Sequence, residues 1–280
     1  MSYSPPSKLV VTIAGSDCSG GAGIQADLKT FGVFGVFGAS VITAVTAQNS
    51  QRFYQANVLS PEHFYSQWQA VLEGAPIAAI KLGMLGNAAM ANAVADALGR
   101  FQQEFPATPI IIDPVLKASS GGDLSGEATA AVYKERLIPL AHLFTPNIPE
   151  AARLLGESEA CDLNTVEQQA AALKQLGARA VLLKGGHLES PLPHEQTLAC
   201  DVLVDDLGCY RFTAARIKTI HSHGGGCTLA SAIAAGLAQG LNLRQAIAAA
   251  KTFIAGALAQ SARLQLAPSN GPIHHFYSYW

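Results

Sequence analysis

The sequence predicts an α/β fold in which a mostly parallel central sheet carries helices on both faces, a three-layer αβα arrangement. Short β-branched runs alternate with longer helical stretches along the whole chain. Several of the short runs are apolar without alternation, which is typical of parallel strands that are covered on both faces. No long Pro- or Ser-rich linker interrupts this order, so we expect a single domain over residues 1–280.

The predicted strands are six short runs and one hairpin. The hairpin covers residues 201–212, with Asp206, Leu207 and Gly208 in its turn, and it predicts an antiparallel edge on the sheet. The six runs of the parallel part are residues 8–14, 40–46, 78–82, 109–113, 143–145 and 180–184.

The predicted helices lie between these strands. Ser60 and Thr165 are expected N-caps, because proline or an acidic residue follows each of them in the first turn. The repeat FGVFGVFG at residues 31–38 is too short for a structural repeat and indicates a helix end and turn. The eight helical segments are residues 24–34, 62–72, 88–101, 126–138, 149–155, 166–176, 227–238 and 243–259.

Composition and charge exclude several classes of protein. With 49% hydrophobic and 14% charged residues, the chain is not intrinsically disordered. The 18 basic and 20 acidic side chains give a net charge of -2, so we expect neither nucleic acid nor a membrane surface as a partner. The uncharged stretches at residues 31–47 and 224–243 contain glycine and polar residues and are not expected to span a bilayer.

The cysteines and the N-terminal residues predict the cellular setting. Five cysteines are an odd number, and no two of them form a CxxC pair. The first residues, MSYSPPSKLVV, lack the charged and apolar regions of a secretory signal. We therefore expect a reducing, cytoplasmic location.

A first glycine cluster, GSDCSGGAG at residues 15–23, follows the first strand and leads into a helix. Such a turn can expose backbone N–H groups and let a ligand approach the main chain closely. The cluster does not match the GxxxxGK[ST] phosphate loop. A ligand-binding loop and a plain glycine turn both remain open.

A second cluster, HSHGGGCT at residues 221–228, precedes an alanine-rich helix. Gly224, Gly225 and Gly226 can direct N–H groups toward one point at the positive end of the helix dipole, which predicts a cradle for a phosphoryl group. The same field would favour the thiolate of Cys227 and make it a base or nucleophile. A buried structural cysteine is the alternative, and a zinc site of His221, His223 and Cys227 would have only three ligands.

Polar residues also follow three other strands, where open α/β sheets place their sites. Asp113 ends one strand, and Asn147 and Glu150 offer an amide and a carboxylate to a hydrated metal ion, although a capping box explains them almost as well. Lys184, in the segment KGGH at residues 184–187, suits a phosphate contact or belongs to a simple turn. Together these signals predict phosphoryl transfer from a nucleotide with Mg²⁺.

The ordered segments resemble the hydroxymethylpyrimidine/phosphomethylpyrimidine kinases of thiamine biosynthesis, members of the ribokinase-like superfamily. This resemblance implies transfer of the γ-phosphate of ATP to 4-amino-5-hydroxymethyl-2-methylpyrimidine and then to its monophosphate, by a homodimer that uses Mg²⁺. The matching segments are TIAGSDCSGGAGIQADLKTF, SVITAVTAQNS, IKLGMLG, IIDPVLKASSGG, TPNIPEAARLL, LLKGGHLE, HGGGCTLASAIAAGLA and GPIHHF.

The resemblance also implies roles for individual residues. Gly224, Gly225 and Gly226 would form the anion hole, with Cys227 at the position of the catalytic base. Asn147 and Glu150 would lie near Mg²⁺, while Asp113 and Lys184 would face the phosphates, Asp113 also reaching the metal through water. The residues implied to line the pyrimidine pocket are Gly15, Asp27, Val45, Gln48, Met84 and Val115.

Two positions depart from the family pattern, which usually reads HGTGC in the second cluster. Gly225 replaces the threonine, which keeps the N–H group, removes a hydroxyl and adds backbone freedom, so turnover could be slower. Cys18 stands where proline or serine is usual, which predicts sensitivity to oxidation at this position. The alternatives to the main interpretation are a pyridoxal kinase and a non-catalytic pyrimidine-sensing module.

Overall fold

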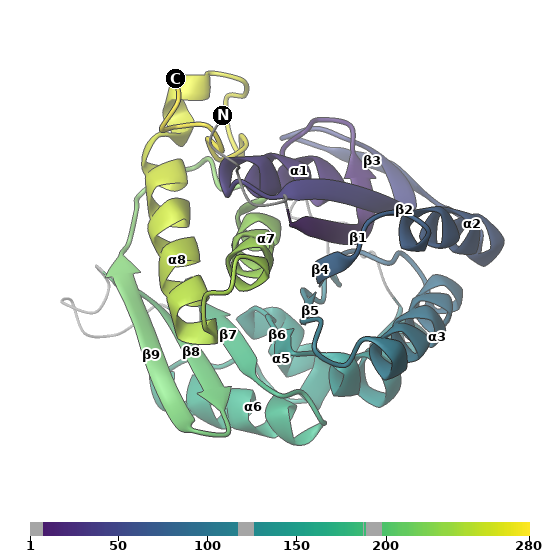
Figure 1. The fold of residues 1–280 in the computed structure, drawn as a ribbon. Coiled ribbons are helices and arrows are strands. Elements are labelled where there is room, and N and C mark those ends of the chain that lie inside the picture. The colour runs from purple at the N-terminus through teal and green to yellow at the C-terminus, as the bar shows by residue number, and fades with distance from the viewer. Residues whose placement is uncertain (1–7, 117–125, 187, 189–197) are drawn as a thin grey trace, which may run out of the picture.

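The computed structural model of the protein describes residues 8–116, 126–186, 188 and 198–280. These residues form a sheet of nine strands in the order β3-β2-β1-β4-β5-β6-β7-β8-β9, with helices on both faces (Figure 1). The six neighbouring strands β2, β1, β4, β5, β6 and β7 pair parallel to one another. Strand β3 at one edge and strands β8 and β9 at the other pair antiparallel. The predicted α/β class with a mostly parallel sheet is confirmed.

Every predicted strand is present, and one further strand was not predicted. This strand, β3, lies at the edge of the sheet, where Gln55 and Asn57 break the apolar pattern that identifies buried strands. Asn49 closes the turn that leads into it, because its side chain accepts from the amides of Gln51 and Arg52. The strands are β1 (Leu9–Asp17), β2 (Phe37–Gln48), β3 (Phe53–Val58), β4 (Ile77–Leu82), β5 (Ile110–Ile112), β6 (Leu143–Phe144), β7 (Val181–Gly185), β8 (Leu198–Asp205) and β9 (Gly208–Ala215).

The helices form two layers, each packed on its own hydrophobic cluster. Helices α1, α7 and α8 cover one face of the sheet, and α2 to α6 cover the other (Figure 1). The helices are α1 (Gly23–Val33), α2 (Pro61–Leu72), α3 (Ala88–Glu104), α4 (Glu127–Val132), α5 (Ile148–Leu155), α6 (Leu163–Gln175), α7 (Gly225–Ala238) and α8 (Leu243–Ala259).

Two of the helix predictions were wrong in detail. The α-helix predicted over residues 126–138 ends at Val132 and continues as a π-helix (Tyr133–Leu137) and a 3₁₀ turn (Ile138–Leu140). Pro139 lacks an N–H group and its ring crowds the carbonyl four residues earlier, which disfavours α-helical geometry there. Helix α6 begins earlier than predicted, because Asp162 rather than Thr165 is its N-cap and accepts from the Thr165 amide.

The two uncharged stretches belong to this ordinary fold. Residues 31–47 contain the end of α1 and most of β2, and residues 224–243 consist largely of α7. None of the helices in the described part of the chain is long and apolar enough to cross a membrane.

The topology brings several loops to one edge of the sheet. Strand β1 lies between β2 and β4, and the chain reaches β2 through α1 on one face and β4 through α2 on the other. Ligands of open α/β sheets bind at the carboxyl ends of the strands beside such a switch point. The register of β1 against β2 shifts between Ala14 and Ser16, so Gly15 lies at a bulge at this edge.

Candidate active site

The first glycine cluster folds around the side chain of Asp17, the last residue of β1. The Asp17 carboxylate accepts hydrogen bonds from the backbone amides of Ser19, Gly21 and Ala22 at 3.0, 3.2 and 2.8 Å. The amide of Gly20 donates to the Asp17 carbonyl. An internal carboxylate and carbonyl therefore already accept from four N–H groups of residues 19–22, which favours the interpretation of this part of the cluster as a glycine turn.

The second glycine cluster forms the start of α7. Gly224 is the N-cap with a φ of 83°, and no side chain caps the helix. The amides of a first helical turn have no intrahelical acceptor. The Gly225 amide donates to the Ser222 carbonyl at 3.1 Å, and the other amides at the start of α7 can bind an anion at the positive end of the helix. The three glycines thus lie where the prediction of an anion hole requires them, with Gly225 and Gly226 already inside the first turn.

Polar groups from β5 and β7 meet at this helix terminus. Lys184 Nζ donates to Asp113 Oδ1 at 2.6 Å. A Cβ atom placed on Gly226 would lie 3.3 Å from Lys184 Nζ and 3.9 Å from Asp113 Oδ2. The two predicted phosphate-facing residues are therefore direct neighbours of the predicted anion hole. His187 of the same predicted segment lies outside the described residues.

Asn147 and Glu150 form a capping box at the N-terminus of α5. Asn147 Oδ1 accepts from the Glu150 amide at 2.8 Å, and Glu150 Oε2 accepts from the Asn147 amide at 2.8 Å. The structural interpretation of this pair is thus correct. Burial, together with the negative charge of Asp113, raises the pKa of the Glu150 carboxyl to about 7, against the opposing charge of Lys184.

This group of side chains fits a divalent cation. Two carboxylates, Asp113 and Glu150, face the single ammonium of Lys184, and burial, with the charge of Asp113 as a smaller cause, raises the pKa of Glu150. Carboxylate oxygens are suitable partners for Mg²⁺ and for the waters that it retains. A hydrated Mg²⁺ held through Asp113, with Glu150 behind it, therefore agrees with the chemistry of the residues present.

Cys227 is the third residue of α7 and is half-buried. Desolvation raises the pKa of its thiol to about 11; the ammonium of Lys81 opposes this effect, whereas Asp27 and Asp113 add to it. The expectation that the helix terminus favours the thiolate at neutral pH is therefore wrong. Loss of hydration and two nearby carboxylates outweigh the favourable field.

Five of the six predicted pocket residues gather at the carboxyl ends of β1, β2, β4 and β5. A Cβ atom on Gly15 would lie 3.1 Å from Met84 Sδ, and Val115 packs against the small cluster of Ala44 and Met84. The remaining pocket residues come from β2. Val45 pairs with Ser16, next to Gly15, and is 46% exposed, while the Gln48 carbonyl accepts from the thiol of Cys18 at 3.3 Å.

Asp27 does not belong to the pocket surface, because none of its surface is exposed. Its Oδ2 accepts from Thr12 Oγ1 at 2.6 Å and from Lys81 Nζ at 2.9 Å, and its Oδ1 accepts from Ser231 Oγ at 2.6 Å. Asp27 therefore supports the site from within the core. The sequence carried one signal of this network, a lysine in the otherwise apolar strand IAAIKL.

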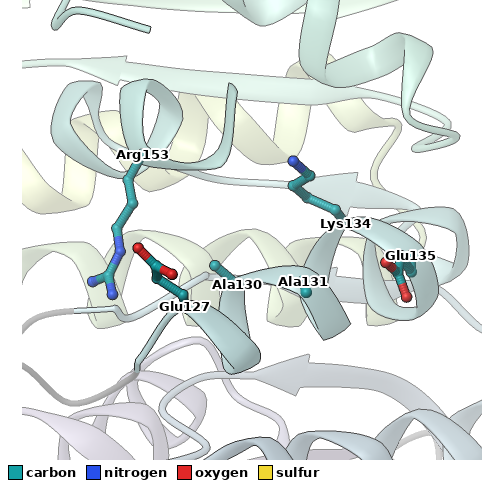
Figure 2. Close-up of a pocket in the computed structure, with 6 residues that line it drawn as sticks. All are labelled: Glu127, Ala130, Ala131, Lys134, Glu135 and Arg153. Atoms are coloured by element: carbon teal, nitrogen blue, oxygen red, sulfur yellow. The ribbon is translucent and has the colours of Figure 1, made fainter. Parts of the chain in front are cut away.

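His223 contacts Asp17, and a surface groove is formed by residues outside the predicted site. His223 Nε2 lies 2.9 Å from Asp17 Oδ2, and no group of three potential metal-binding His, Cys, Asp or Glu side chains occurs among the described residues. A groove of about 330 Å³, which includes none of the predicted site residues, lies between α4 and α5 and is shown in Figure 2; it is lined by Glu127, Ala130, Ala131, Lys134, Glu135 and Arg153.

Comparison with known proteins identifies close relatives. The family described as phosphomethylpyrimidine kinase matches residues 17–274. The hydroxymethylpyrimidine/phosphomethylpyrimidine kinase of Rhizobium meliloti (strain 1021) is 43% identical over 272 residues, which are 97% of this chain and 98% of the relative. Among solved structures, the phosphomethylpyrimidine kinase of Clostridium difficile 630 is 35% identical, with a TM-score of 0.76 over 90% of this chain and 99% of its own. Pyridoxal kinase of Bacillus subtilis, solved as an ADP complex, is 33% identical with a TM-score of 0.85 over 98% and 99%.

The buried pair of Lys81 and Asp27 yields a prediction on stability. Lys81→Met removes the ammonium and leaves the Asp27 carboxylate buried with two hydroxyl donors, so we expect the free energy of unfolding to fall by about 3–5 kcal/mol. Urea denaturation measures this change. The matched control is Lys174→Met, which breaks a 2.6 Å pair whose Asp206 partner is 83% exposed and should cost less than about 1 kcal/mol. An equal loss for the two variants would contradict the supporting role of Asp27.

Proposed function

The chain belongs to the phosphomethylpyrimidine kinase family, and we propose that it phosphorylates 4-amino-5-hydroxymethyl-2-methylpyrimidine and then the resulting monophosphate, with ATP as donor. The observation that carries this proposal is the meeting of the α7 N-terminus, Lys184 and Asp113 at the carboxyl edge of the sheet. The fold is ribokinase-like, as the sequence predicted, because its structural neighbours include pyridoxal kinases. The continuous sheet and the family match over residues 17–274 support one kinase domain.

We infer that the pyrimidine lies against Gly15, Met84 and Val115. The Gln48 amide can donate and accept a hydrogen bond at the same time, which suits the amino group and adjacent ring nitrogen of an aminopyrimidine. Gly15 leaves space beside Met84, since a Cβ atom there would lie only 3.1 Å from Met84 Sδ. Val45, from the adjacent strand, covers the ring.

The phosphate side consists of groups that stabilise negative charge. The amides of Gly224 and Gly226 receive the phosphoryl group in transit, and Gly225 joins them when its amide leaves the Ser222 carbonyl. Lys184 neutralises part of the charge on the donor phosphates. When bound, Mg²⁺ supplies further neutralisation of the phosphate oxygens. Asp113 would hold it through water, while Glu150 and Asn147 keep the N-terminus of α5 in place behind Asp113.

Cys227 is the proposed proton acceptor. In the transfer, the substrate hydroxyl oxygen bonds to the γ-phosphorus, the bond to the ADP oxygen breaks, and the hydroxyl proton moves to Cys227 Sγ. Only the thiolate can accept this proton. Because burial raises the pKa of Cys227 to about 11, the competent form increases as the pH rises toward that value. The ammonium of Lys81 is the nearby charge that favours it.

We also propose that the protein is a cytoplasmic homodimer. The five cysteines are free thiols in the structure, which agrees with a reducing compartment. Tyr54, on the edge strand β3, is 61% exposed, and Phe37, at the opposite end of β2, is 66% exposed. Exposed aromatic side chains of this kind support association with a second copy.

The first prediction on function concerns substrate choice. A coupled assay of ADP release should give a kcat/KM for hydroxymethylpyrimidine at least about tenfold above that for pyridoxal, because pyridoxal leaves the Gln48 amide incompletely paired. Mass spectrometry should identify the pyrimidine mono- and diphosphate as products. Gln48→Leu should lower kcat/KM for the pyrimidine more than for pyridoxal. A preference for pyridoxal would support the alternative kinase, and binding without ADP release would support a sensing module.

The proton acceptor is tested by Cys227→Ala. We expect kcat at saturating substrate to fall by about 100-fold, the range of a lost general base. In the wild type, kcat should rise with pH between 7 and 10. With a pKa of about 11, the thiol is mostly protonated in this range, and the fraction present as thiolate increases with pH. The variant should lose that rise. Cys209→Ala, which changes an exposed cysteine of β9, is the control, and a Cys227→Ala enzyme with wild-type kcat would exclude the base.

The departure at Gly225 is tested by restoring the threonine. Apart from its chain neighbours and its own helix backbone, none of the described residues comes within 4 Å of a Cβ placed on Gly225, so Gly225→Thr should fit and remove about 0.5–1 kcal/mol of backbone freedom. We expect kcat to rise about two- to fivefold. Gly224→Thr is the control, because its Cβ would lie 1.8 Å from the Gly21 carbonyl oxygen at a φ of +83°, and it should abolish activity. A lower kcat for Gly225→Thr would contradict the expectation that the cradle is less preorganised.

A further inference from the structure

A buried hydrogen bond joins the two glycine clusters, which lie about 200 residues apart in the sequence. The Asp17 carboxylate and the His223 imidazole are 2.9 Å apart and only 2% and 5% exposed as side chains. We propose that Asp17 and His223 are positioning residues, which hold the substrate-side turn (residues 18–22) and the anion hole (the amides of residues 224–226) at one fixed separation. This inference rests on the proposed function and assigns two further residues to the same reaction.

Asp17 determines the shape of the substrate-side turn. Besides three backbone amides, it accepts from Ser19 Oγ at 2.8 and 3.0 Å. Burial opposes its ionisation, but the hydrogen bonds from His223 and from the turn prevail and hold the pKa of this carboxyl well below its usual range. Asp17 also pairs with Thr46 of β2, between the pocket residues Val45 and Gln48.

His223 determines the entry of the chain into α7. It directly precedes the N-cap Gly224, and its own backbone is held by the C-terminal segment, with its amide donating to the Gly271 carbonyl and its carbonyl accepting from Ile273. Because Asp17 is ionised, His223 Nε2 carries the proton and donates to it. Hydrogen bonds therefore hold both parts of His223: the main chain through its amide and carbonyl, and the imidazole ring through Nε2.

The two clusters also approach each other closely through Gly21 and Gly224. A Cβ atom on Gly21 would lie 2.4 Å from His223 Cδ2, and one on Gly224 would lie 1.8 Å from the Gly21 carbonyl oxygen. No side chain fits at either contact. The glycines allow this close approach, and the hydrogen bond between Asp17 and His223 fixes the relative orientation of the two clusters.

The connection between the two clusters determines how far apart the reacting atoms lie. The turn lies beside the pyrimidine pocket, whereas the anion hole receives the phosphoryl group, so their separation sets the distance between hydroxyl and phosphorus. A displacement of about 1 Å between reacting groups can lower a rate by about 100-fold. The pair would thus act on kcat rather than on the affinity for either substrate alone.

The test compares His223→Leu, His223→Gln and wild type. For His223→Leu we expect a fall in kcat of about 100-fold, while the dissociation constants of the pyrimidine and of ADP, measured separately by calorimetry, change less than about threefold. His223→Gln should recover most of the kcat, since its amide nitrogen can donate to Asp17. If the glutamine variant is as slow as the leucine variant, the hydrogen bond is not the cause and the proposal is overturned.

The matched control is His275→Leu. His275 is 3% exposed and bonds to Thr228 of α7 at 2.9 Å, but it makes no hydrogen bond to the substrate-side turn. Its thermal midpoint should fall by about as much as that of His223→Leu, with kcat within about threefold of wild type. An equal loss of kcat in both variants would reduce the role of His223 to general stability.

A readout without catalysis separates this proposal from the proposed function. Hydrogen exchange should become faster together in residues 18–22 and 224–227 of His223→Leu, and should stay slow in residues 18–22 of His275→Leu. If the wild-type enzyme forms no phosphorylated pyrimidine, the proposed function is refuted. The exchange measurement then still decides whether Asp17 and His223 connect the two clusters. Unchanged exchange in the turn of His223→Leu would overturn the connection itself.

Discussion

The hydrogen bonds to Asp27 connect the elements on which the site is built. Its carboxylate on α1 binds Thr12 of β1, Lys81 of β4 and Ser231 of α7. Ser231 lies one helical turn beyond Cys227 and therefore on the same face of α7. The bond that fixes Ser231 thus also fixes the direction in which Cys227 and the first amides of α7 point. A buried carboxylate has this effect because leaving any of its partners unpaired in the core is costly.

A near-neutral protein can hold a polyphosphate only if positive potential is concentrated at one place. The net charge of -2 excludes a broad basic surface, and the positive charge of Lys81 is neutralised by its pair with Asp27. The α7 N-terminus and Lys184 remain as local sources of positive potential. Asp113 offsets part of the lysine charge at 2.6 Å, and Glu150 adds a second carboxylate whose pKa is raised to about 7. This balance explains why a divalent cation suits the site: without one, the carboxylates would repel the phosphates that the helix terminus attracts.

The fold class followed from the sequence, and so did the edge of the sheet where most of the proposed site residues gather, because both depend on local patterns. Apolar runs identified the parallel strands, and polar residues after them identified the edge where they meet. Strand β3 was missed because an edge strand faces solvent and carries polar residues such as Gln55 and Asn57. The position of Asp27 in the core and the raised pKa of Cys227 could not be predicted, since both depend on burial by segments distant in sequence. Sequence spacing indicates which residues lie near one edge, whereas only the packing decides which of them water or substrate can reach.

The two glycine clusters illustrate the same distinction, because similar composition serves opposite purposes in them. In the first, the amides of Ser19, Gly21 and Ala22 donate to Asp17, so glycine is required there for positive φ at Gly20 and for close packing at Gly21. In the second, no side chain caps α7 and the Gly225 amide donates to a backbone carbonyl, while the other amides of the helix terminus keep their capacity for an external anion. The carboxylate that closes the first cluster is the one that holds His223 beside the second. An anion hole that must stay uncapped is therefore positioned by hydrogen bonds made just outside it, and the first cluster provides the acceptor for them.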